Sequence, residues 1–502
     1  MTTPTGFRTR IVVALASGAL LGGSYPPSPL GPLAWLALAP LMVGLLDANR
    51  PRWAMVEAFV AFVTAGGVAF GWIFWHPYLP VVLASVGALL TWAVLMAVPW
   101  AGAAWLPLPP AGRLVVLAAG ILGMEGLLTH TPWPMPWALF GHTQATVPGI
   151  RQLAAFGGVP LLSAWVLGAN VALALALRRR LRVALPLVVL LALSAAAGGR
   201  RVATMDAPAR QAPILLVQPN LGAETWADAS NRTRVHHLLR LTGSALDTVA
   251  SRPALVVWPE TALPPHAPAV RDSLQRWVDR TRVPLLTGTV AATPSADRFY
   301  QHANRALLLQ PGQTTQSYDK AYPVPFVEHV PLIDRFPRLR ALRVEGGGVR
   351  GYQRGTGAVR LTTDTLAIGP LVCFESALGP HARQYAAGPR PVDVLVTVAQ
   401  TGWWSDPWPA RQHAALSRLR AIELGRALAL ATVRGPSTVL TPTGEPLPGS
   451  AWDEERAVLV RVPVYASLPP YARVGDWVGV LALFVLAAGV GAAVIGARSP
   501  DA

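Results

Sequence analysis

Long apolar segments constrain this chain more than any other feature, because about 20 apolar residues match the hydrocarbon thickness of a bilayer. Seven such segments precede residue 199 and an eighth lies near the C-terminus, at residues 9–24, 32–48, 54–74, 79–100, 112–129, 158–177, 182–198 and 475–497. Only 14% of all residues are charged, whereas soluble domains carry about a quarter. The sequence therefore predicts a bundle of eight membrane helices.

Arginines at alternate ends of these segments indicate how the bundle is oriented, because basic loops stay on the cytoplasmic side. The flanking arginines that fall on one side are Arg8, Arg10, Arg50, Arg52, Arg113, Arg178, Arg179, Arg180, Arg182 and Arg498. Both termini are then cytoplasmic, and the long stretch between segments seven and eight is external. Arg200 and Arg201 oppose this pattern weakly.

We therefore expect a transmembrane bundle at residues 1–198, an external domain at 199–472, and a last helix with a short cytoplasmic tail at 473–502. The expected location is a bacterial inner (cytoplasmic) membrane, with the domain in the periplasm. Residues 9–24 also resemble a signal peptide, but no convincing cleavage site follows them, which favours a retained helix.

The charge balance and the cysteine content exclude other classes of protein. The net charge is +16, yet the arginines form no continuous basic face with interleaved aromatic residues, so we expect no nucleic-acid partner. Cys373 is the only cysteine, so no intramolecular disulfide can form. The ten histidines show no metal-ligand spacing, and we expect neither a metal nor a soluble cofactor.

Two features of the predicted bundle could have a role in function as well as in structure. Residues 130–157 are rich in Trp and Pro and look too broken for a helix. They fit either an interfacial aromatic belt or a surface that admits lipid. Glu125 lies near the external end of its segment, where an acid is either functional or a helix-packing hydrogen-bond partner.

The region between segments seven and eight alternates short apolar runs with helical patterns, which is typical of a layered α/β domain. Strands are predicted near residues 212–220, 254–259, 283–290, 305–310, 366–373, 392–400, 428–434 and 438–445. Helices are predicted at 232–250, after residue 373, and at 410–427.

Three reactive side chains follow predicted strands: Glu260, Lys320 and Cys373. A thiol needs a base or a nearby cation to become a thiolate, and an ammonium group can also stabilise an oxyanion. Each residue alone could also have a purely structural role: Glu260 as a turn cap, Lys320 as a surface charge and Cys373 as a core residue. Lys320 is nevertheless the only lysine among 42 basic residues, and an ammonium differs from the broad guanidinium chiefly where its compactness is needed.

The segments "WPET", "YDKAYPVPFVEHVP" and "GPLVCFES" resemble the nitrilase, or carbon-nitrogen hydrolase, superfamily. That resemblance implies an αββα sandwich with a Glu–Lys–Cys triad. The flanking apolar segments, with "GWW" at 402–404 and "RQHAALSRLRAIELGR" at 411–426, are similar to its membrane-embedded branch, the apolipoprotein N-acyltransferases. The implied fold is a nitrilase-like domain inserted between helices seven and eight of an eight-helix bundle.

The resemblance also implies an activity: N-acylation of the α-amine of an apolipoprotein's S-diacylglyceryl-cysteine, with a phospholipid as acyl donor and a thioester on Cys373. Glu260 is expected to act as general base, and Lys320 with the main-chain N–H of Phe374 as oxyanion hole. Glu328 would orient Lys320, and Glu375 would support the site. The expected partners are the phospholipid donor, the diacylglyceryl-apolipoprotein acceptor and the membrane, for a monomeric enzyme.

Further candidates surround these residues. Those expected to contact lipid or substrate are Trp258, Tyr322, Trp403 and Trp404. His329 and His413 could form a Cys–His pair, but surface or supporting roles fit their contexts better. The family usually has Asn-Asp where this chain has Gln400-Thr401, and Asn-Thr-Gly-Ile-Ser where it has "VRGPS" from Val433 and Arg434 onward. Both departures bear on substrate preference and activity.

Two other readings compete with the transferase. A membrane-tethered amidase or hydrolase would use the same triad but pass the acyl group to water. A scaffold or a transporter with an accessory domain would instead show a degenerate triad or intramembrane charge pairs along a pathway, and the sequence shows neither. The apolar bundle and its aromatic loops favour the transferase.

Overall fold

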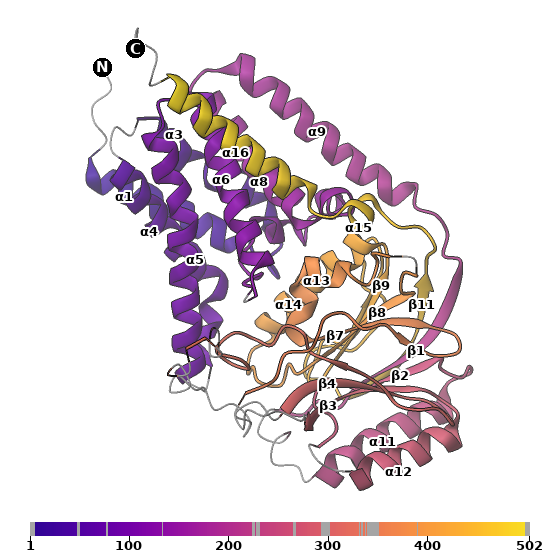
Figure 1. Cartoon of the computed structure of the whole chain (residues 1–502). Helices are drawn as coiled ribbons and strands as arrows, with labels where there is room; N and C mark the ends of the chain where they lie inside the picture. Colours follow the sequence, from indigo (N-terminus) through magenta and orange to yellow (C-terminus); the bar gives the residue numbers. More distant parts are fainter. Residues whose placement is uncertain are drawn as a thin grey trace.

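The computed structural model describes residues 6–47, 51–76, 79–132, 134–222, 226, 231–264, 268–292, 302–330, 332, 335–336, 338, 351–388 and 390–496. A helical bundle lies beside an α/β domain, and the two are joined where helix α9 (Leu181–Ala203) leads into strand β1 (Arg210–Gln218) (Figure 1). The chain returns to the bundle through α15 (Pro470–Val474) and α16 (Trp477–Gly496).

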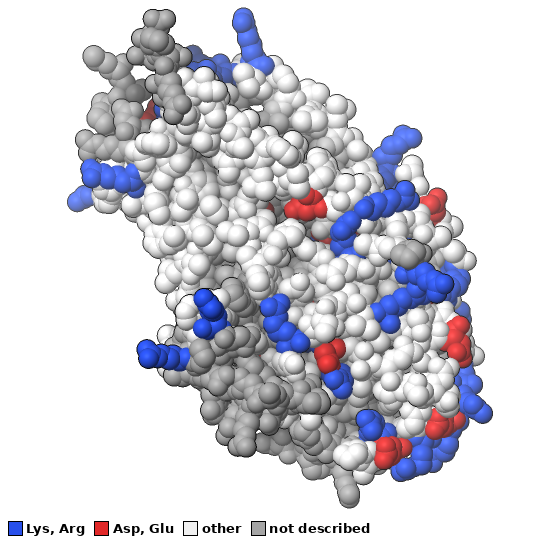
Figure 2. Space-filling model, in the orientation of Figure 1, with Lys and Arg blue, Asp and Glu red and all other residues white. Residues whose placement is uncertain are grey.

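Every predicted apolar segment contains helix. Besides α9 and α16, the bundle consists of α1 (Phe7–Gly23), α3 (Ala39–Asp47), α4 (Pro51–Phe70), α5 (Leu79–Trp105), α6 (Pro110–His130) and α8 (Ala154–Leu177). Among the described residues, six helices are long and apolar enough to cross a membrane, while α1 and the segment 31–47 are shorter. The count of eight spans therefore stays a prediction. On the face in Figure 2, the middle of the bundle carries almost no charged side chains.

The second predicted span is not one helix. It divides into η1 (Gly31–Leu33), α2 (Ala34–Ala37) and α3, with the break at Leu38. Asn170 of α8 stabilises the break, because its Oδ1 accepts hydrogen bonds from the main-chain N–H groups of Leu38 and Ala39 at 2.8 and 2.9 Å. A side chain from a distant helix thus satisfies donors that a continuous helix would have paired internally.

Residues 130–157 are more helical and more buried than predicted. They form η3 (Phe140–Gln144), α7 (Pro148–Arg151) and the first turn of α8, and all five residues of η3 are buried. The helix α8 bends at Gly157 and Gly158, where Gly158 has φ = +67°. The ring of Tyr471 lies 2.5 Å from the position a Cβ of Gly158 would take, so only glycine fits there.

Two sheets form the α/β domain. The six-stranded sheet has the order β11-β1-β2-β3-β4-β5, with β11 Arg456–Val464, β2 Leu255–Val257, β3 Leu285–Ala292, β4 His302–Leu309 and β5 Gln316–Asp319. The five-stranded sheet has the order β10-β9-β8-β7-β6, with β10 Thr438–Leu440, β9 Ala427–Thr432, β8 Val394–Ala399, β7 Ala367–Val372 and β6 Leu361–Thr362. Strands β1–β3 and β7–β9 run parallel within their sheets.

The alternation of side chains along each strand creates four layers. Ile214 of β1 and Val396 of β8 belong to the core between the sheets. Leu215 faces the opposite way, toward α11 (Asn231–Thr248) and α12 (Pro268–Thr281). Leu395 packs toward α13 (Gly379–Arg383) and α14 (Pro407–Leu424) on the other outer face. The result is the predicted αββα sandwich, with α14 between its five-stranded sheet and the bundle (Figure 1).

Candidate active site

Glu260 follows β2 and lies at the end of the six-stranded sheet. Its side chain is buried, and the next residue, Thr261, has φ = +53°. Gly288 of β3 passes directly beneath this turn: a Cβ there would lie 2.6 Å from the Cα of Glu260. The turn that presents the carboxylate therefore depends on a glycine in the neighbouring strand.

Lys320 comes directly after β5, and only 1% of it is exposed. Its Nζ lies 2.8 Å from Oε2 of Glu328 and 3.8 Å from Oε1 of Glu260. Burial acts to lower the pKa of Lys320, but the two carboxylates outweigh it, so the pKa is raised above its ordinary value. The ammonium group is thus kept charged inside the domain.

Cys373 begins the short helix η5 (Cys373–Ala377), immediately after β7. Its φ of +51° is uncommon for a residue with a side chain and marks a sharp turn from strand to helix. Burial and the Glu260 carboxylate raise the pKa of the thiol, whereas Lys320 acts to lower it. The resting cysteine is therefore a thiol that needs a base before it can attack.

Asn304 of β4 joins the two carboxylates of the site. Its Nδ2 donates to Oε1 of Glu260 at 2.6 Å and to Oε1 of Glu328 at 3.1 Å. Burial raises the pKa of Glu260, and Lys320 and Asn304 partly oppose this effect. Asn304 was not among the residues expected at the site, because it lies at the polar start of β4, just before the predicted strand at 305–310.

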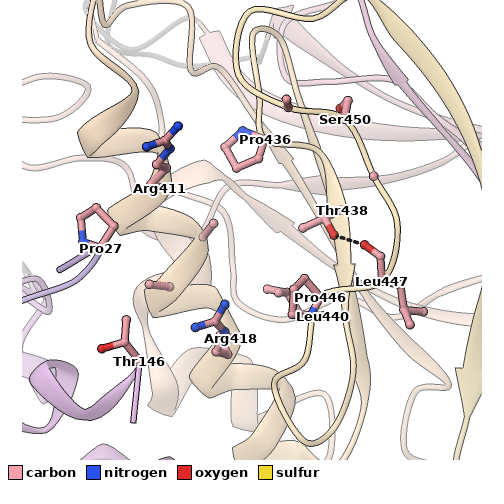
Figure 3. A pocket seen from close by; sticks show the side chains of 14 residues that line it. Pro27, Thr146, Arg411, Arg418, Pro436, Thr438, Leu440, Pro446, Leu447 and Ser450 are labelled. Atoms are coloured by element: carbon pink, nitrogen blue, oxygen red, sulfur yellow. Dashed lines mark hydrogen bonds between the residues drawn. The ribbon is translucent and has the colours of Figure 1, made fainter. Parts of the chain in front are cut away.

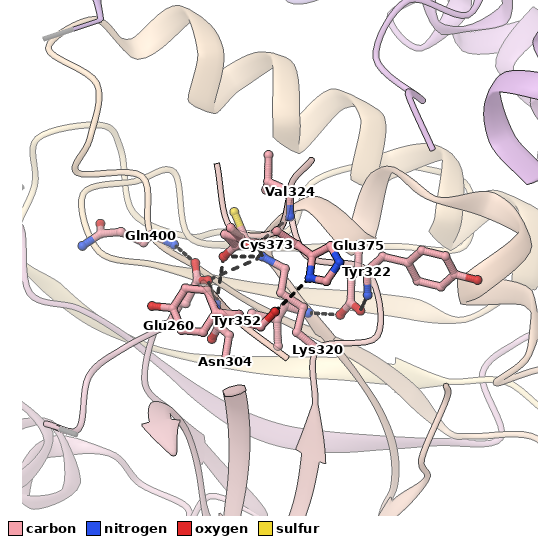
Figure 4. A network of polar contacts seen from close by, with 12 residues as sticks. Glu260, Asn304, Lys320, Tyr322, Val324, Tyr352, Cys373, Glu375 and Gln400 are labelled. Atoms are coloured by element: carbon pink, nitrogen blue, oxygen red, sulfur yellow. Dashed lines mark hydrogen bonds and ion pairs between the residues drawn. The ribbon is translucent and has the colours of Figure 1, made fainter. Parts of the chain in front are cut away.

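Glu375 connects the turn at Cys373 to the segment after Lys320. Its Oε1 accepts from the main-chain N–H groups of Ala321 and Tyr322 at 2.7 and 3.0 Å, and its Oε2 accepts from that of Val372 at 2.8 Å. The Tyr318 hydroxyl donates to the same carboxylate at 2.6 Å. Glu375 therefore holds the lysine and the cysteine in register, as Figure 4 shows.

The main chain at Gln400-Thr401 contacts the Glu260 carboxylate. The main-chain N–H of Gln400 donates to Oε2 of Glu260 at 2.7 Å. The side-chain Oε1 of Gln400 accepts from Gly402 N, and Thr401 Oγ1 accepts from the main-chain N–H of Arg434. The Nε2 of Gln400 is buried without a hydrogen-bond partner within the described part of the chain.

Two histidines near the site have structural contacts. His413 Nε2 lies 3.0 Å from the carbonyl oxygen of Cys373 and 2.7 Å from Ser376 Oγ. Burial lowers the pKa of His413 to about 4, so it is neutral at physiological pH. His329 Nδ1 lies 3.1 Å from the carbonyl oxygen of Tyr352. These polar contacts join the two rings to main-chain and hydroxyl oxygens, which fits the supporting roles favoured above.

The aromatic candidates divide between the core and the boundary with the bundle. Trp258 is fully buried beneath α11 and donates to Thr242 Oγ1 at 2.9 Å, so the expectation that it contacts lipid is wrong. Trp404 packs edge-on against Trp72 of the bundle at 4.4 Å between ring centroids. Tyr322 is half-buried, 5.1 Å from the His381 ring, and Trp403 is half-buried as well.

Together these contacts place a carboxylate, an ammonium and a thiol at one end of the two sheets. Glu260 can accept a proton from the thiol, and Lys320 can stabilise negative charge on sulfur or on an attacked carbonyl oxygen. Phe374 lies in the first turn of η5, where main-chain N–H groups lack partners within the helix. The arrangement suits nucleophilic acyl transfer through a thioester.

Comparison with known proteins agrees with this geometry. Residues 17–172 match the family model of the apolipoprotein N-acyltransferase N-terminal domain, and residues 207–466 match that of carbon-nitrogen hydrolases. An apolipoprotein N-acyltransferase from Azotobacter vinelandii is 31% identical and covers 93% of this chain and 92% of its own. One from Chlorobaculum tepidum is 27% identical, over 93% of this chain and 95% of its own.

Among solved structures, a carbon-nitrogen hydrolase superfamily protein from Xanthomonas campestris, with an arsenic adduct in its active site, is 20% identical. It covers 50% of this chain and 90% of its own, with a TM-score of 0.36. The first family model ends within α8, and the second begins between α9 and β1, so it covers the α/β domain. The chain belongs to the apolipoprotein N-acyltransferase family, within the carbon-nitrogen hydrolases.

Proposed function

We propose that the protein transfers an acyl chain from a phospholipid to the α-amine of an apolipoprotein's S-diacylglyceryl-cysteine. One observation carries the mechanism: the Lys320 ammonium is held between Glu260 and Glu328 beside the turn that presents Cys373. Family membership supplies the substrates, because its curated relatives are named apolipoprotein N-acyltransferases.

In the first half-reaction, Glu260 takes the proton from Cys373 Sγ as the sulfur attacks the ester carbonyl of the phospholipid. Lys320 Nζ and the main-chain N–H of Phe374 stabilise the oxyanion of the tetrahedral intermediate. The C–O bond then breaks, and Glu260 returns the proton to the departing oxygen. Lysophospholipid leaves, and the acyl chain remains as a thioester on Cys373.

In the second half-reaction, the α-amine of the diacylglyceryl-cysteine attacks the thioester carbonyl. Glu260 accepts the proton lost by the amine, and the C–S bond breaks as the oxyanion collapses. The sulfur takes the proton back from Glu260, and the thiol is restored. Dividing the transfer into two steps lets both substrates use one oxyanion site in turn.

Contacts with the bundle support a lipid donor over a soluble one. Trp404, four residues beyond Gln400, packs against Trp72, and Trp72 Nε1 donates to Gln412 of α14 at 3.2 Å. Gln412 in turn donates to the carbonyl oxygen of Pro26 at 2.9 Å. The segment that contacts Glu260 therefore rests against the bundle. In the proposed orientation this end of the bundle is external, and acyl esters of the bilayer are within its reach.

The location and topology are part of this proposal. The bundle would lie in the bacterial inner membrane with the domain on the periplasmic side, as the basic flanks indicate. The domain boundaries would be 1–198, 199–472 and 473–502, and the enzyme would act as a monomer on the phospholipid and lipoprotein partners.

Intact-protein mass spectrometry tests both half-reactions. After incubation of the detergent-solubilised chain with phospholipid, we expect a mass increase of one acyl chain, absent in Cys373→Ala. A synthetic diacylglyceryl-cysteine peptide should remove this adduct and gain the acyl chain on its amine. Glu455→Gln, an exposed carboxylate just before β11, serves as a control that should retain the adduct.

The same experiment decides against the alternatives. Loss of the adduct in buffer as fast as in the presence of peptide, without N-acylated product, would establish a hydrolase instead. An unchanged mass with several phospholipids would contradict the thioester mechanism.

A further inference from the structure

A separate cavity lies at the junction of bundle and domain. Its volume is about 500 Å³, within the usual range for small-molecule sites. Pro27 and Thr146 line it from the bundle, Arg411 and Arg418 from α14, and residues 436–451 from the loops around β10. Figure 3 shows both guanidinium groups projecting from α14 toward the wall formed by Pro436, Thr438 and Pro446.

This cavity lies on the face of α14 opposite the catalytic site. His413, Ser417 and Arg420 contact Cys373, Ser376 and Ala377 through hydrogen bonds, and they occupy one face of the helix. Arg411 and Arg418 are seven positions apart and lie about 140° around the helix from that face, at 100° per residue. The cavity is therefore not a branch of the site around Cys373.

The hydroxyl groups of the lining are already engaged as donors. Thr438 Oγ1 donates to Leu447 O at 2.8 Å, Ser450 Oγ to Gln218 Oε1 at 2.7 Å, and Thr146 Oγ1 to Ser28 O at 3.1 Å. The remaining walls are mostly alanine, proline and leucine. The two arginines are consequently the groups available to bind a polar ligand.

Neither guanidinium group is fully satisfied. Arg418 donates from Nη1 to Ala145 O at 3.1 Å, but its Nε is buried and lacks a partner among the described residues. Arg411 is exposed and makes no hydrogen bond or ion pair within the described part of the chain. No acidic residue is among those lining the cavity, although Glu445 lies close enough to influence Arg418.

The surrounding charges leave a positive excess. Glu445 forms an ion pair with Arg151, and Arg201 donates to neutral oxygens of Gln152 and Pro442. Burial and the nearby Arg151 lower the pKa of Arg418, while Glu445 acts to raise it. An anion in the cavity would relieve this repulsion.

We propose that the cavity is an accessory site for the phosphate group of a glycerophospholipid. Guanidinium groups bind phosphate oxygens through paired, charge-assisted hydrogen bonds. The apolar walls would contact the glycerol esters and the first methylene groups of the acyl chains. The site lies at the external end of the bundle, level with Pro27 after α1, where headgroups surround the protein. It would hold a lipid that is not the acyl donor and fix the domain on the membrane surface.

Native mass spectrometry of the full chain in detergent tests this site without turnover. The protein carries Cys373→Ala, and the probe is dioctanoyl phosphatidylglycerol, with dioctanoyl glycerol and inorganic phosphate as comparisons. We expect two lipids to bind. The affinity for one of them should fall about tenfold or more when Arg411→Gln and Arg418→Gln are combined, because the charge-assisted hydrogen bonds to its phosphate are lost. Arg456→Gln, an exposed arginine outside the cavity, should leave both lipids bound.

Arg411→Gln alone keeps the test valid if the half-buried Arg418 proves necessary for folding, because Arg411 is exposed; it should show a smaller loss of the same lipid. Equal binding of lipid to the double variant and to the parent would overturn the proposal. So would equal affinity for dioctanoyl glycerol, which lacks the phosphate, or equal affinity for inorganic phosphate, which lacks the lipid. Failure here would leave the acyl transfer at Cys373 untouched, since no turnover is measured.

Discussion

Helix α9 and strand β9 are both rich in leucine and alanine, but they bury those side chains differently. Leu190 and Leu193 of α9 are 62% and 64% exposed, whereas Leu428 and Leu430 of β9 are fully buried. The apolar surface of α9 faces away from the protein and needs lipid to cover it. The surface of β9 is covered by the opposite sheet and by α14. Apolar residues of this chain therefore face lipid in α9 and the protein core in β9.

The difference extends to charge. The domain buries Lys320, Arg420 and Glu423, each paired with an opposite charge, while α9 carries arginines only at its two ends. A lipid-facing helix tolerates many apolar substitutions, but a buried ion pair depends on both partners. Four predictions test this contrast, and they are ordered by expected effect.

The largest effect is expected where the two regions meet. Arg420 donates from Nε and Nη2 to Glu423 at 2.7 Å each and from Nη1 to Ala377 O at 2.6 Å, and Glu423 accepts from Val159 N of α8 at 2.9 Å. Arg420→Ala leaves the Glu423 carboxylate buried and unpaired, and we expect a loss of about 3–5 kcal/mol in the free energy of unfolding. Thermal unfolding in detergent measures it.

Arg434→Ala is the matched control, because its ion pair with Asp453 is partly exposed. Its loss should stay below about 1 kcal/mol. Similar unfolding temperatures for the Arg420 and Arg434 variants would contradict the buried coupling.

Lys320→Arg tests whether the buried cation can be exchanged. The guanidinium is broader than the ammonium and cannot occupy the same point between Glu260 and Glu328, so the oxyanion loses its nearest cation. We expect kcat to fall about 10²–10³-fold, the usual cost of losing one oxyanion donor. Acylation of the diacylglyceryl-cysteine peptide measures it.

Arg305→Lys offers the reverse exchange at the partly exposed pair with Asp319, one strand away. Its activity should remain close to that of the parent. Full activity in Lys320→Arg would remove the lysine from the proposed mechanism.

Truncating one leucine in β9 and one in α9 compares the stability lost in the protein core with that lost on a lipid-facing surface. Leu428→Ala should cost about 2–5 kcal/mol, because it leaves a cavity between sheet and helix. Leu190→Ala should cost less than about 1 kcal/mol, because lipid replaces the lost contacts. Unfolding of both variants in the same detergent gives the comparison, and equal costs would show that α9 packs against protein instead.

The last effect concerns pH, and it stays below about 1 kcal/mol as long as the pH is kept above 6. The unfolded chain protonates His413 near its ordinary pKa of about 6.5, whereas the folded chain does so only at about 4. Between these values the unfolded state binds more protons, so stability falls as the pH is lowered from 6.5 toward 4. His413→Gln should lose less stability over the same window. Parallel pH profiles for parent and variant would contradict the buried, neutral histidine.

Much of the site followed from chain order and local pattern. Glu260 and Cys373 each come just after a predicted strand, whereas Lys320 follows the unpredicted strand β5, and the structure brings the three together at one end of the two sheets. Their catalytic roles stay predictions until the variants are measured. The burial of Trp258 was not predictable, because a tryptophan beside this motif looks the same in sequence whether it faces lipid or the core.

Other features had no local signal. Asn304 lies in the antiparallel partner of β5, and the pairing of Arg420 with Glu423 gains its importance only from Val159 and Ala377. The edge strand β11 was not predicted either, and it pairs with β1 far back in the chain. Each of these depends on a contact between segments distant in sequence.

The sequence by itself determined the apolar helices, the alternating strands and the identity of the reactive side chains, because hydropathy and side-chain periodicity are patterns among residues close together in the chain. Only the tertiary structure decided where the second apolar segment breaks, since the break needs Asn170 from another helix to satisfy its main-chain donors. It also decided that α14 separates the catalytic site from an arginine-lined cavity, because the two faces of a helix acquire different neighbours only when the bundle and the sheets pack against it.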